Sequence, residues 1–358
     1  MDTPWGPLAQ LDPCDDDLAM RIIAEDKDTL VEGLIVEDLF DQFLRLVGHG
    51  VSILDLETAI AAEGHRRYAF VWSRVQNQQG LRRYLNALEQ VTARTFVVRF
   101  LKGDFWAAPW VEGRALAEER GLLTATVEAL TGRRAKHSGI DAGVRDNTRQ
   151  RRAFWGNSLQ ATRDPHTRWE RIILPRLFLN HGLGPYFPRL WNLDRICVTE
   201  HDVWLLEAKH KYPFRNRAGL MFGINRGEME NVRLLAGGPD PIRCLHVLMV
   251  KPKWERGIGP LYLLNDLEMR QRVAVIAMDL SARAARIVAN RPVAAPAYTT
   301  FSGRGGVAYH PMPATDFHWI GRLTDSVESI ANGLFSMLSG VGMPSKVRDG
   351  DLDALRVG

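Results

Sequence analysis

The chain has 358 residues, of which 46% are hydrophobic and 25% are charged, and its formal net charge is +4. This composition is typical of a globular protein with one or two ordinary cores. The chain holds no apolar stretch long enough to span a bilayer, and its first residues show neither the n-region nor the h-region of a secretory signal. Three cysteines without CxxC spacing argue against a zinc site or a disulfide framework, so we expect a cytoplasmic protein.

Residues 1–132 are predicted to form a mostly helical N-terminal domain. Apolar periodicity indicates helices over 15–47, 54–62, 80–92 and 111–131, and one short strand over 95–100. Asp15, Asp16 and Asp17 begin the first of these helices, where the helix dipole favours negative charge. We therefore interpret this acidic run as a helix N-terminus rather than as a metal site.

Residues 133–163 are predicted to be a basic connector. Residues 1–60 hold 14 Asp and Glu against three Lys and Arg, whereas residues 133–176 hold 11 Lys and Arg against four Asp and Glu. Phosphate contacts from such basic residues supply most of the sequence-independent affinity for nucleic acid. The arginines that we expect to contact a nucleic acid are Arg149, Arg151, Arg152, Arg163 and Arg168. The alternative is a solvated surface loop with some salt bridges.

A helix and then a β-hairpin are predicted from residue 164 onward. Asp164 as N-cap and Pro165 at the first helical position mark the start of the helix, and Pro175 is expected to kink or divide it. The hairpin covers residues 194–209, with an apolar strand on each side of a polar turn at 200–202.

The second strand of this hairpin places two opposite charges on one face. Side chains alternate along a strand, so Glu207 and Lys209 project the same way with Ala208 between them. The hairpin can bring Asp194, at its start, near Glu207. Two clustered carboxylates are favourable when a divalent cation lies between them, and their hard oxygens suit Mg²⁺ or Mn²⁺. The alternative is a surface sheet with an incidental salt bridge between Glu207 and Lys209.

The predicted core domain covers residues 164–265 and is completed by a helix and a strand. The helix is expected over 228–236 and the apolar strand over 245–250. Asn225, Arg226 and Glu230 lie at the front of that helix, and we expect them to face the same site as Glu207. Residues 266–358 are predicted to be an α-rich C-terminal extension, with helices over 266–290 and 324–338. The fold class is therefore mixed α/β.

Asp194 and the triplet Glu207-Ala208-Lys209 resemble the motif of the PD-(D/E)xK nuclease superfamily. Leu193 stands where that family usually has a proline. The resemblance covers residues 164–252 and implies a restriction-endonuclease-like core of helix, mixed β-sheet and helix. It further implies that Asp194, Glu207 and the carbonyl of Ala208 hold Mg²⁺ or Mn²⁺. Lys209 would orient a water or stabilise charge on the attacked phosphate, and Glu170 would bind the metal through water.

We expect a metal-dependent nuclease that hydrolyses phosphodiester bonds, with DNA as the first candidate substrate. By analogy of fold type, such a protein suits bacterial defence or mobile-element processing. The implied partners are nucleic acid and either a second copy of the chain, as a homodimer, or another protein of a defence system. Two alternatives stay open, namely an RNA-directed nuclease and a non-catalytic nucleic-acid-binding or regulatory module on a nuclease-like fold.

Overall fold

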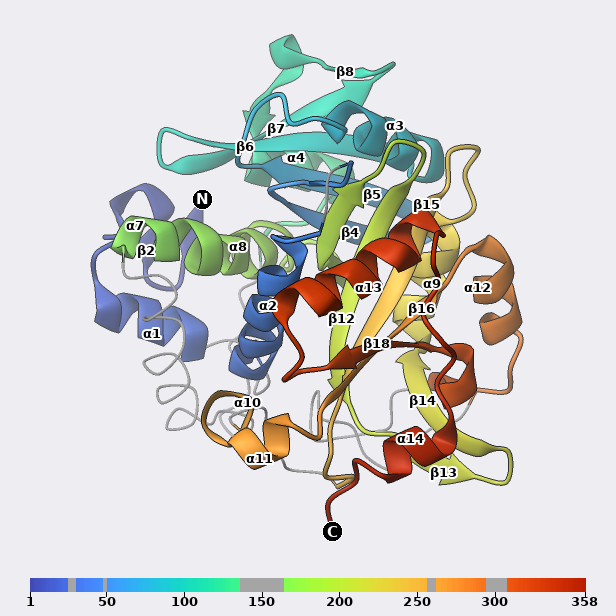
Figure 1. The fold of residues 1–358 in the computed structure, drawn as a ribbon. Coiled ribbons are helices and arrows are strands. Elements are labelled where there is room, and N and C mark those ends of the chain that lie inside the picture. Colours follow the sequence, from blue (N-terminus) through green and yellow to red (C-terminus); the bar gives the residue numbers. More distant parts are fainter. Residues whose placement is uncertain (25–29, 48–49, 136–163, 256–261, 294–307) are drawn as a thin grey trace. The chain divides into compact units, whose positions relative to one another are not determined.

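The computed structural model describes residues 1–24, 30–47, 50–135, 164–255, 262–293 and 308–358 (Figure 1). The chain divides into two compact units. Unit 1 comprises Met1–Leu30 and Leu54–Arg195, and unit 2 comprises Val31–Ile53 and Ile196–Gly358. Both units contain helices and strands, so the predicted mixed α/β class is confirmed. No helix in the described residues combines the length and apolar character that crossing a membrane requires.

Unit 1 is built on a seven-stranded sheet in the order β10-β4-β5-β6-β7-β8, with β9 also paired to β7. Its strands are β4 (Leu56–Glu63), β5 (Arg66–Ser73), β6 (Arg94–Leu101), β7 (Asp104–Val111), β8 (Arg114–Ala115), β9 (Gly121–Leu122) and β10 (Arg189–Leu193). Strands β5 and β6 are parallel because helix α3 (Leu81–Val91) connects them, whereas the other pairs are antiparallel. Strands β1 (Asp2–Thr3) and β2 (Gly6–Pro7) form a separate ribbon.

The prediction of a mostly helical N-terminal domain is wrong. The segment 54–62, predicted as a helix, contains strand β4, which pairs with β5 on one side and with β10 on the other. Its alanines favour a helix by intrinsic propensity, yet Ala59–Ala62 are fully buried inside the sheet, and tertiary burial overrides that weak preference. Residues 111–131 are likewise helical only in part, in the 3₁₀ turn η2 (Ala117–Glu119) and in α4 (Leu123–Thr131).

Two predicted helix starts in unit 1 are confirmed by their caps. Helix α1 (Asp16–Ala24) begins after Asp15, whose Oδ1 accepts a hydrogen bond from the Leu18 amide at 2.8 Å. Asp164 accepts one from the Thr167 amide, also at 2.8 Å, at the start of α7 (Pro165–Arg168). The short 3₁₀ turn η1 (Leu8–Gln10) precedes α1.

The helix that follows Asp164 is not divided at Pro175. It continues through η5 (Trp169–Ile173), α8 (Leu174–Leu177) and η6 (Phe178–Leu183). Segments η5 and η6 are wider π-helical turns, and the Leu174 amide bonds to the carbonyl of Trp169, five residues back. A π-helical turn can replace the usual hydrogen bonds to the residue four positions back without ending the helix. The helix can therefore continue through Pro175.

Unit 2 is built on a six-stranded mixed sheet in the order β18-β16-β15-β12-β11-β3 (Figure 1). Its strands are β3 (Ser52–Ile53), β11 (Arg195–Val198), β12 (Val203–Lys211), β15 (Ile242–Val250), β16 (Ala274–Asp279) and β18 (His318–Arg322). Strands β12 and β15 are parallel over nine residue pairs, and helix α9 (Arg226–Leu235) lies between them in the chain. Helix α9 packs on β15, and α13 (Val327–Ser339) packs on β16 and β18.

A second sheet of unit 2 contains β13 (Phe214–Asn216), β14 (Gly219–Asn225) and β17 (Tyr309–Pro313) in that order. The remaining helical elements of unit 2 are α2 (Leu30–Leu44), α10 (Tyr262–Asn265), α11 (Leu267–Arg270), α12 (Ala282–Ala289), η7 (Ala314–Asp316) and α14 (Asp349–Asp353). Helix α9 also contacts β14 and β17, so this second sheet lies near the start of α9.

The hairpin, α9, β15 and α13 agree with the sequence predictions, whereas the helix expected over 266–290 does not. That range holds α11, the buried strand β16 and α12. An apolar run that is buried on both faces has no helical or strand periodicity, so pattern alone cannot identify it. The C-terminal region is therefore not a helical extension, because its strands β16 and β18 belong to the main sheet of unit 2.

Candidate functional site

Strand β12 carries three ionisable side chains on one face, because Glu207, Lys209 and Lys211 are two residues apart. Glu207 is buried, with 6% of its surface exposed, and its Oε1 forms an ion pair with the Lys209 ammonium. Lys211 Nζ donates a hydrogen bond to the carbonyl of Gly223 on β14 at 2.7 Å. The predicted approach of Glu207 and Lys209 is confirmed, and their role in catalysis stays a prediction.

A histidine and a second glutamate lie beside this row, and sequence reasoning missed both. His246 on β15 is directly opposite Glu207 in the parallel register and is fully buried. Its Nδ1 lies 3.6 Å from Oε1 of Glu228, in the first turn of α9. The sequence contains a signal that could have identified His246, because it is the single polar residue inside the apolar run Leu245–Val250. Glu230, expected to face the site, instead pairs with Arg226 on the helix surface, with 3.1 Å between Arg226 Nε and Glu230 Oε1.

Burial controls the protonation of the basic groups in this cluster. Loss of hydration lowers the pKa of His246 well below 6.5, and the positive charges of Lys211 and Lys209 lower it further, so its imidazole is neutral. Burial also lowers the pKa of Lys211, and the nearby Glu228 opposes that shift.

On the same strand, burial lowers the pKa of His210 to about 3, and its Nε2 lies 2.6 Å from the Tyr262 hydroxyl.

Asp194 belongs to unit 1, whereas Glu207 and Lys209 belong to unit 2. Asp194 directly follows β10, and its backbone carbonyl accepts a hydrogen bond from Arg195 Nη1 at 2.8 Å. Among the residues that the structure describes, no three His, Cys, Asp or Glu side chains are grouped so that they could hold a metal ion. The Glu207 carboxylate and the Ala208 carbonyl are nevertheless hard oxygen donors of the kind that suits Mg²⁺ or Mn²⁺.

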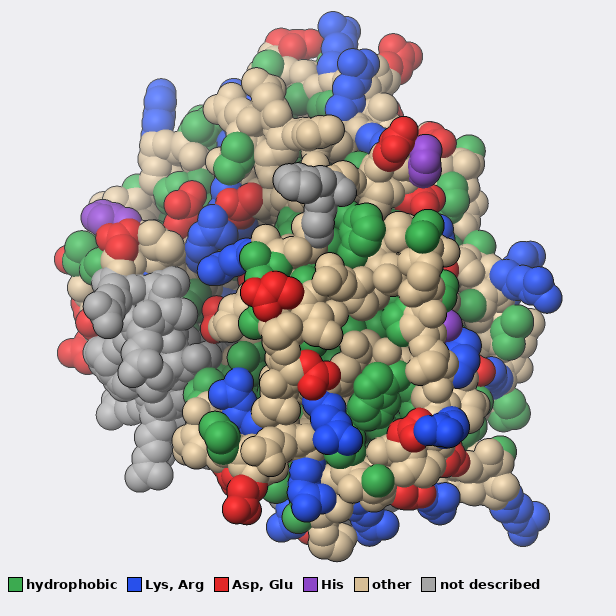
Figure 2. All heavy atoms as spheres, viewed as in Figure 1, with side chains coloured by type: hydrophobic (Ala, Val, Ile, Leu, Met, Phe, Trp, Pro, Cys, Tyr) green, Lys and Arg blue, Asp and Glu red, His purple; other side chains and the backbone are tan. Residues whose placement is uncertain are grey.

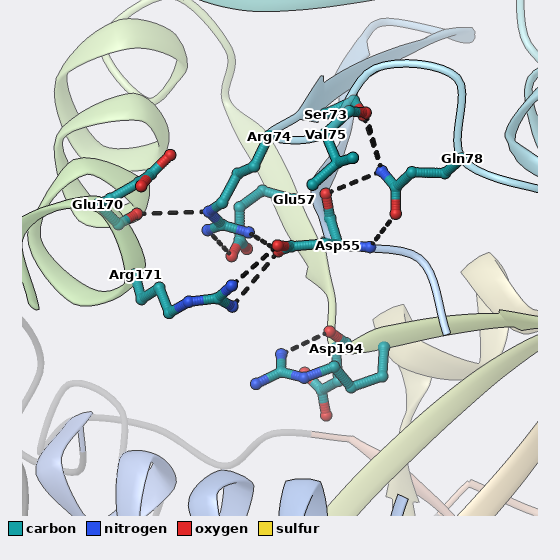
Figure 3. Close-up of polar contacts among 10 residues, drawn as sticks. Asp55, Glu57, Ser73, Arg74, Val75, Gln78, Glu170, Arg171 and Asp194 are labelled. Carbon is teal, nitrogen blue, oxygen red and sulfur yellow. Dashed lines mark hydrogen bonds and ion pairs between the residues drawn. The ribbon is translucent and has the colours of Figure 1, made fainter. Parts of the chain in front are cut away.

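Glu170 lies in η5 with its side chain exposed. In Figure 3 its backbone carbonyl points toward Arg74, which donates to it from Nε at 3.4 Å, while its carboxylate points away. The predicted role of Glu170 in binding a metal through water stays a prediction.

Unit 1 holds a buried charge cluster around Arg74 (Figure 3). The Arg74 side chain is 6% exposed, and its guanidinium pairs with Glu57 at 2.6 Å and with Asp55 at 3.1 Å. Arg171 adds a contact to Asp55 at 2.9 Å. The Gln78 side chain forms two hydrogen bonds with the backbone of Asp55. It accepts one from the Asp55 amide at 2.6 Å and donates one to the Asp55 carbonyl at 3.1 Å. Two carboxylates are thus neutralised by two arginines, which is a structural arrangement rather than a cation site.

The arginines predicted to bind nucleic acid are only partly described. Arg149, Arg151, Arg152 and Arg163 lie outside the described residues. Arg168 is buried, with 2% of its surface exposed, and its guanidinium forms an ion pair with Asp16 at the start of α1. The prediction that Arg168 contacts a phosphate backbone is therefore wrong, because its buried guanidinium is paired with Asp16 inside unit 1.

Charges of both signs lie side by side over α14 and β13 on the face drawn in Figure 2. Arg215 Nη2 lies 2.6 Å from Asp353, and Arg348 Nη2 lies 2.9 Å from Asp351. Such exposed pairs contribute little to stability and do not form a basic surface. The charges of Arg215 and Arg348 are therefore compensated by neighbouring carboxylates.

Two further groups of polar residues in unit 2 have structural explanations. His201 and Asp202 lie in the hairpin turn, which is closed by a hydrogen bond from the Thr199 amide to the Asp202 carbonyl at 2.9 Å. Asp316 and His318 line a cavity of about 260 Å³ together with Asp279, Arg291 and Lys346. Arg291 pairs with Asp316 at 2.9 Å, and Lys346 donates a hydrogen bond to the Asp316 carbonyl at 2.6 Å. The charged groups of Arg291, Asp316 and Lys346 therefore have partners within the protein.

No protein-family model, curated protein or solved structure matches this chain.

Removal of the Arg74 guanidinium should destabilise unit 1. In Arg74→Met the buried Glu57 loses its compensating charge, so the free energy of unfolding should fall by about 3–5 kcal/mol. Arg171→Met is the control, because the Arg171 side chain is 54% exposed and its loss should cost about 0–1 kcal/mol. Urea unfolding followed by circular dichroism measures both. Equal losses in the two variants would contradict the buried-cluster interpretation.

Acid should destabilise the fold through His246. The folded chain keeps this imidazole neutral, whereas the unfolded chain binds a proton below the ordinary pKa of 6.5. The free energy of unfolding should therefore decrease as the pH falls below 6.5, by up to about 1.4 kcal/mol per pH unit for this one group. Urea unfolding between pH 7.5 and 5 should show a shallower pH dependence in His246→Leu. His201→Gln is the control, since that side chain is 83% exposed and should leave the slope unchanged.

Proposed function

We propose that this protein is a nuclease that uses a divalent metal ion to hydrolyse phosphodiester bonds. The observation that carries the proposal is the ion pair of the buried Glu207 with the half-buried Lys209 on a central strand of a mixed sheet. A buried carboxylate in a sheet is costly, so a charged pair at this position indicates a chemical use.

The order of elements supports the proposal. In unit 2 the hairpin of β11 and β12, helix α9 and strand β15 come in this order along the chain, with β13 and β14 between β12 and α9, and β15 is parallel to β12. This is the order expected for the PD-(D/E)xK core that the motif resembles, and Glu207 and Lys209 lie on the strand where that family places them. We therefore propose a restriction-endonuclease-like core formed by these elements.

The proposed chemistry assigns a role to each side chain. Glu207 and the carbonyl of Ala208 would hold Mg²⁺ or Mn²⁺, and the metal would supply a bound water of lowered pKa and polarise the phosphate. Lys209 would leave Glu207 and stabilise the negative charge that develops on the attacked phosphate. DNA is the proposed substrate, with RNA as the alternative that the assay below separates.

A non-catalytic nucleic-acid-binding module is the second candidate. The observation in its favour is that the Glu207 carboxylate is engaged by Lys209. In that case the ion pair would stabilise the sheet, and neither residue would be needed for a reaction.

Glu207→Gln and Lys209→Met should each reduce metal-dependent cleavage by about 100-fold or more, since each removes a charge that acts on the reacting phosphate. Plasmid DNA and a matched RNA are incubated with Mg²⁺, Mn²⁺ or EDTA, and circular dichroism checks the fold. Lys253→Met is the control, because Lys253 is an exposed lysine paired with Glu255. Full cleavage by purified Glu207→Gln would exclude this site, and no cleavage by the wild type would favour the non-catalytic module.

The basic connector should set the salt dependence of binding. With Arg149, Arg151 and Arg152 replaced by alanine, the log–log slope of DNA affinity against salt should fall by about two to three units. The loss should be similar for all sequences, because backbone contacts carry no sequence information. Binding is measured in the Glu207→Gln background, so that DNA is not cut. Alanine at the exposed Arg215, Arg283 and Arg286 is the control, and an equal slope change there would argue against the connector.

A further inference from the structure

The cavity of about 260 Å³ in unit 2 has an apolar wall that is formed by one face of helix α12. Ala284, Ile287 and Val288 line it at positions i, i+3 and i+4, which lie side by side on a helix. Met278 of β16 adds a further apolar side chain. Ile287 is 51% exposed, so a ligand can reach this wall from solvent.

The same helix face leads into a polar end of the cavity. Arg291 lies seven residues after Ala284, and its amide bonds to the Val288 carbonyl at 3.1 Å, so the chain is still coiled there. Asp316 connects Arg291 with Lys346. Its carboxylate lies 2.9 Å from Arg291 Nη2, and its backbone carbonyl accepts a hydrogen bond from Lys346 Nζ at 2.6 Å. These three residues form the polar end.

The polar end carries one positive charge that no carboxylate compensates. Arg291 and Asp316 neutralise each other, whereas the partner of the Lys346 ammonium is an uncharged carbonyl. Within the described ranges Lys346 forms no ion pair. Asp279, the other acid that lines the cavity, is paired with Arg243 at 2.5 Å. An ammonium has three N–H donors, so Lys346 keeps two of them for a ligand.

We propose that this cavity binds a small amphipathic anion, namely a carboxylate or phosphate head on a short apolar chain. The head accepts hydrogen bonds from the Lys346 ammonium, and the chain lies on Ile287 and Met278. The volume is just below the range of about 300–1,000 Å³ that is usual for drug-sized ligands, so the site fits a smaller molecule. The inference goes beyond the proposed nuclease function and does not depend on it, because no residue of the cavity belongs to β12.

Binding of simple probes to the full chain tests the two parts of the ligand separately. Titration calorimetry and saturation-transfer NMR measure hexanoate, hexyl phosphate, hexanol and hexylammonium. At least one of the two anions should bind, the tighter one identifies the head group, and hexanol and hexylammonium should bind about tenfold more weakly or not at all. Shortening hexanoate to butyrate should weaken binding about fourfold for each methylene removed. Equal affinity for hexylammonium, or no binding of either anion, would overturn the inference.

Lys346→Gln tests the contact with the head group. The variant loses a charge-assisted hydrogen bond, so the anion that binds the wild type should bind about tenfold more weakly or worse. Hexanol, which has no charged head, should be affected by less than about threefold. Lys253→Gln is the control, because Lys253 is an exposed lysine paired with Glu255 at 2.7 Å, and it should bind like the wild type. Circular dichroism checks the fold of each variant.

Ile287→Ser tests the apolar wall and keeps the inference falsifiable where Lys346→Gln does not fold. Loss of the apolar contact should weaken the hexyl anion about three- to tenfold and reduce the difference between hexanoate and butyrate. Val111→Ser is the control, since Val111 is an exposed apolar residue of unit 1, 39% exposed. A folded Lys346→Gln or Ile287→Ser protein that binds the anion as tightly as the wild type would overturn the inference.

Discussion

The burial of Glu207 beside Lys209 is the interaction on which the candidate site depends. A carboxylate on a buried strand loses its hydration, and it is tolerated only where an opposite charge is close. Lys209 supplies that charge directly. The next lysine on the same face, Lys211, donates a hydrogen bond to the carbonyl of Gly223 on β14. The buried acid thus explains the charge of Lys209 on this face of β12.

The same physical constraint shapes unit 1. Glu57 at the start of β4 is buried, and Arg74 compensates it while also lying over the ring of Trp72 at 4.7 Å. Asp55, held by Gln78, completes the cluster. Here the guanidinium contacts two carboxylates at hydrogen-bonding distance, and Arg171 satisfies Asp55 further. In unit 2, by contrast, Glu228 Oε1 and both ring nitrogens of His246 have no hydrogen-bond partner within the described ranges. We infer that the Arg74 cluster serves stability, whereas the β12 cluster has spare capacity for a ligand.

Local signals predicted the parts of the fold in which neighbouring residues decide the conformation. The caps at Asp15 and Asp164, the hairpin turn before β12, and the helices α9 and α13 all follow from short-range chemistry. Segments buried on both faces were misassigned, because the alanines of β4 favour a helix by propensity and the apolar run of β16 carries no periodicity. Arg168 was also misassigned, since its partner Asp16 is distant in sequence.

The sequence by itself determined that Glu207 and Lys209 share one face of a strand, because alternation along a strand is a local rule. Only the tertiary structure decided which groups face them. His246 reaches Glu207 through the parallel pairing of β12 with β15, and Glu228 reaches His246 through the packing of α9 on β15. Both contacts join residues far apart in the chain. No local pattern encodes such contacts, because strand order and helix packing are set by the burial of the whole sheet.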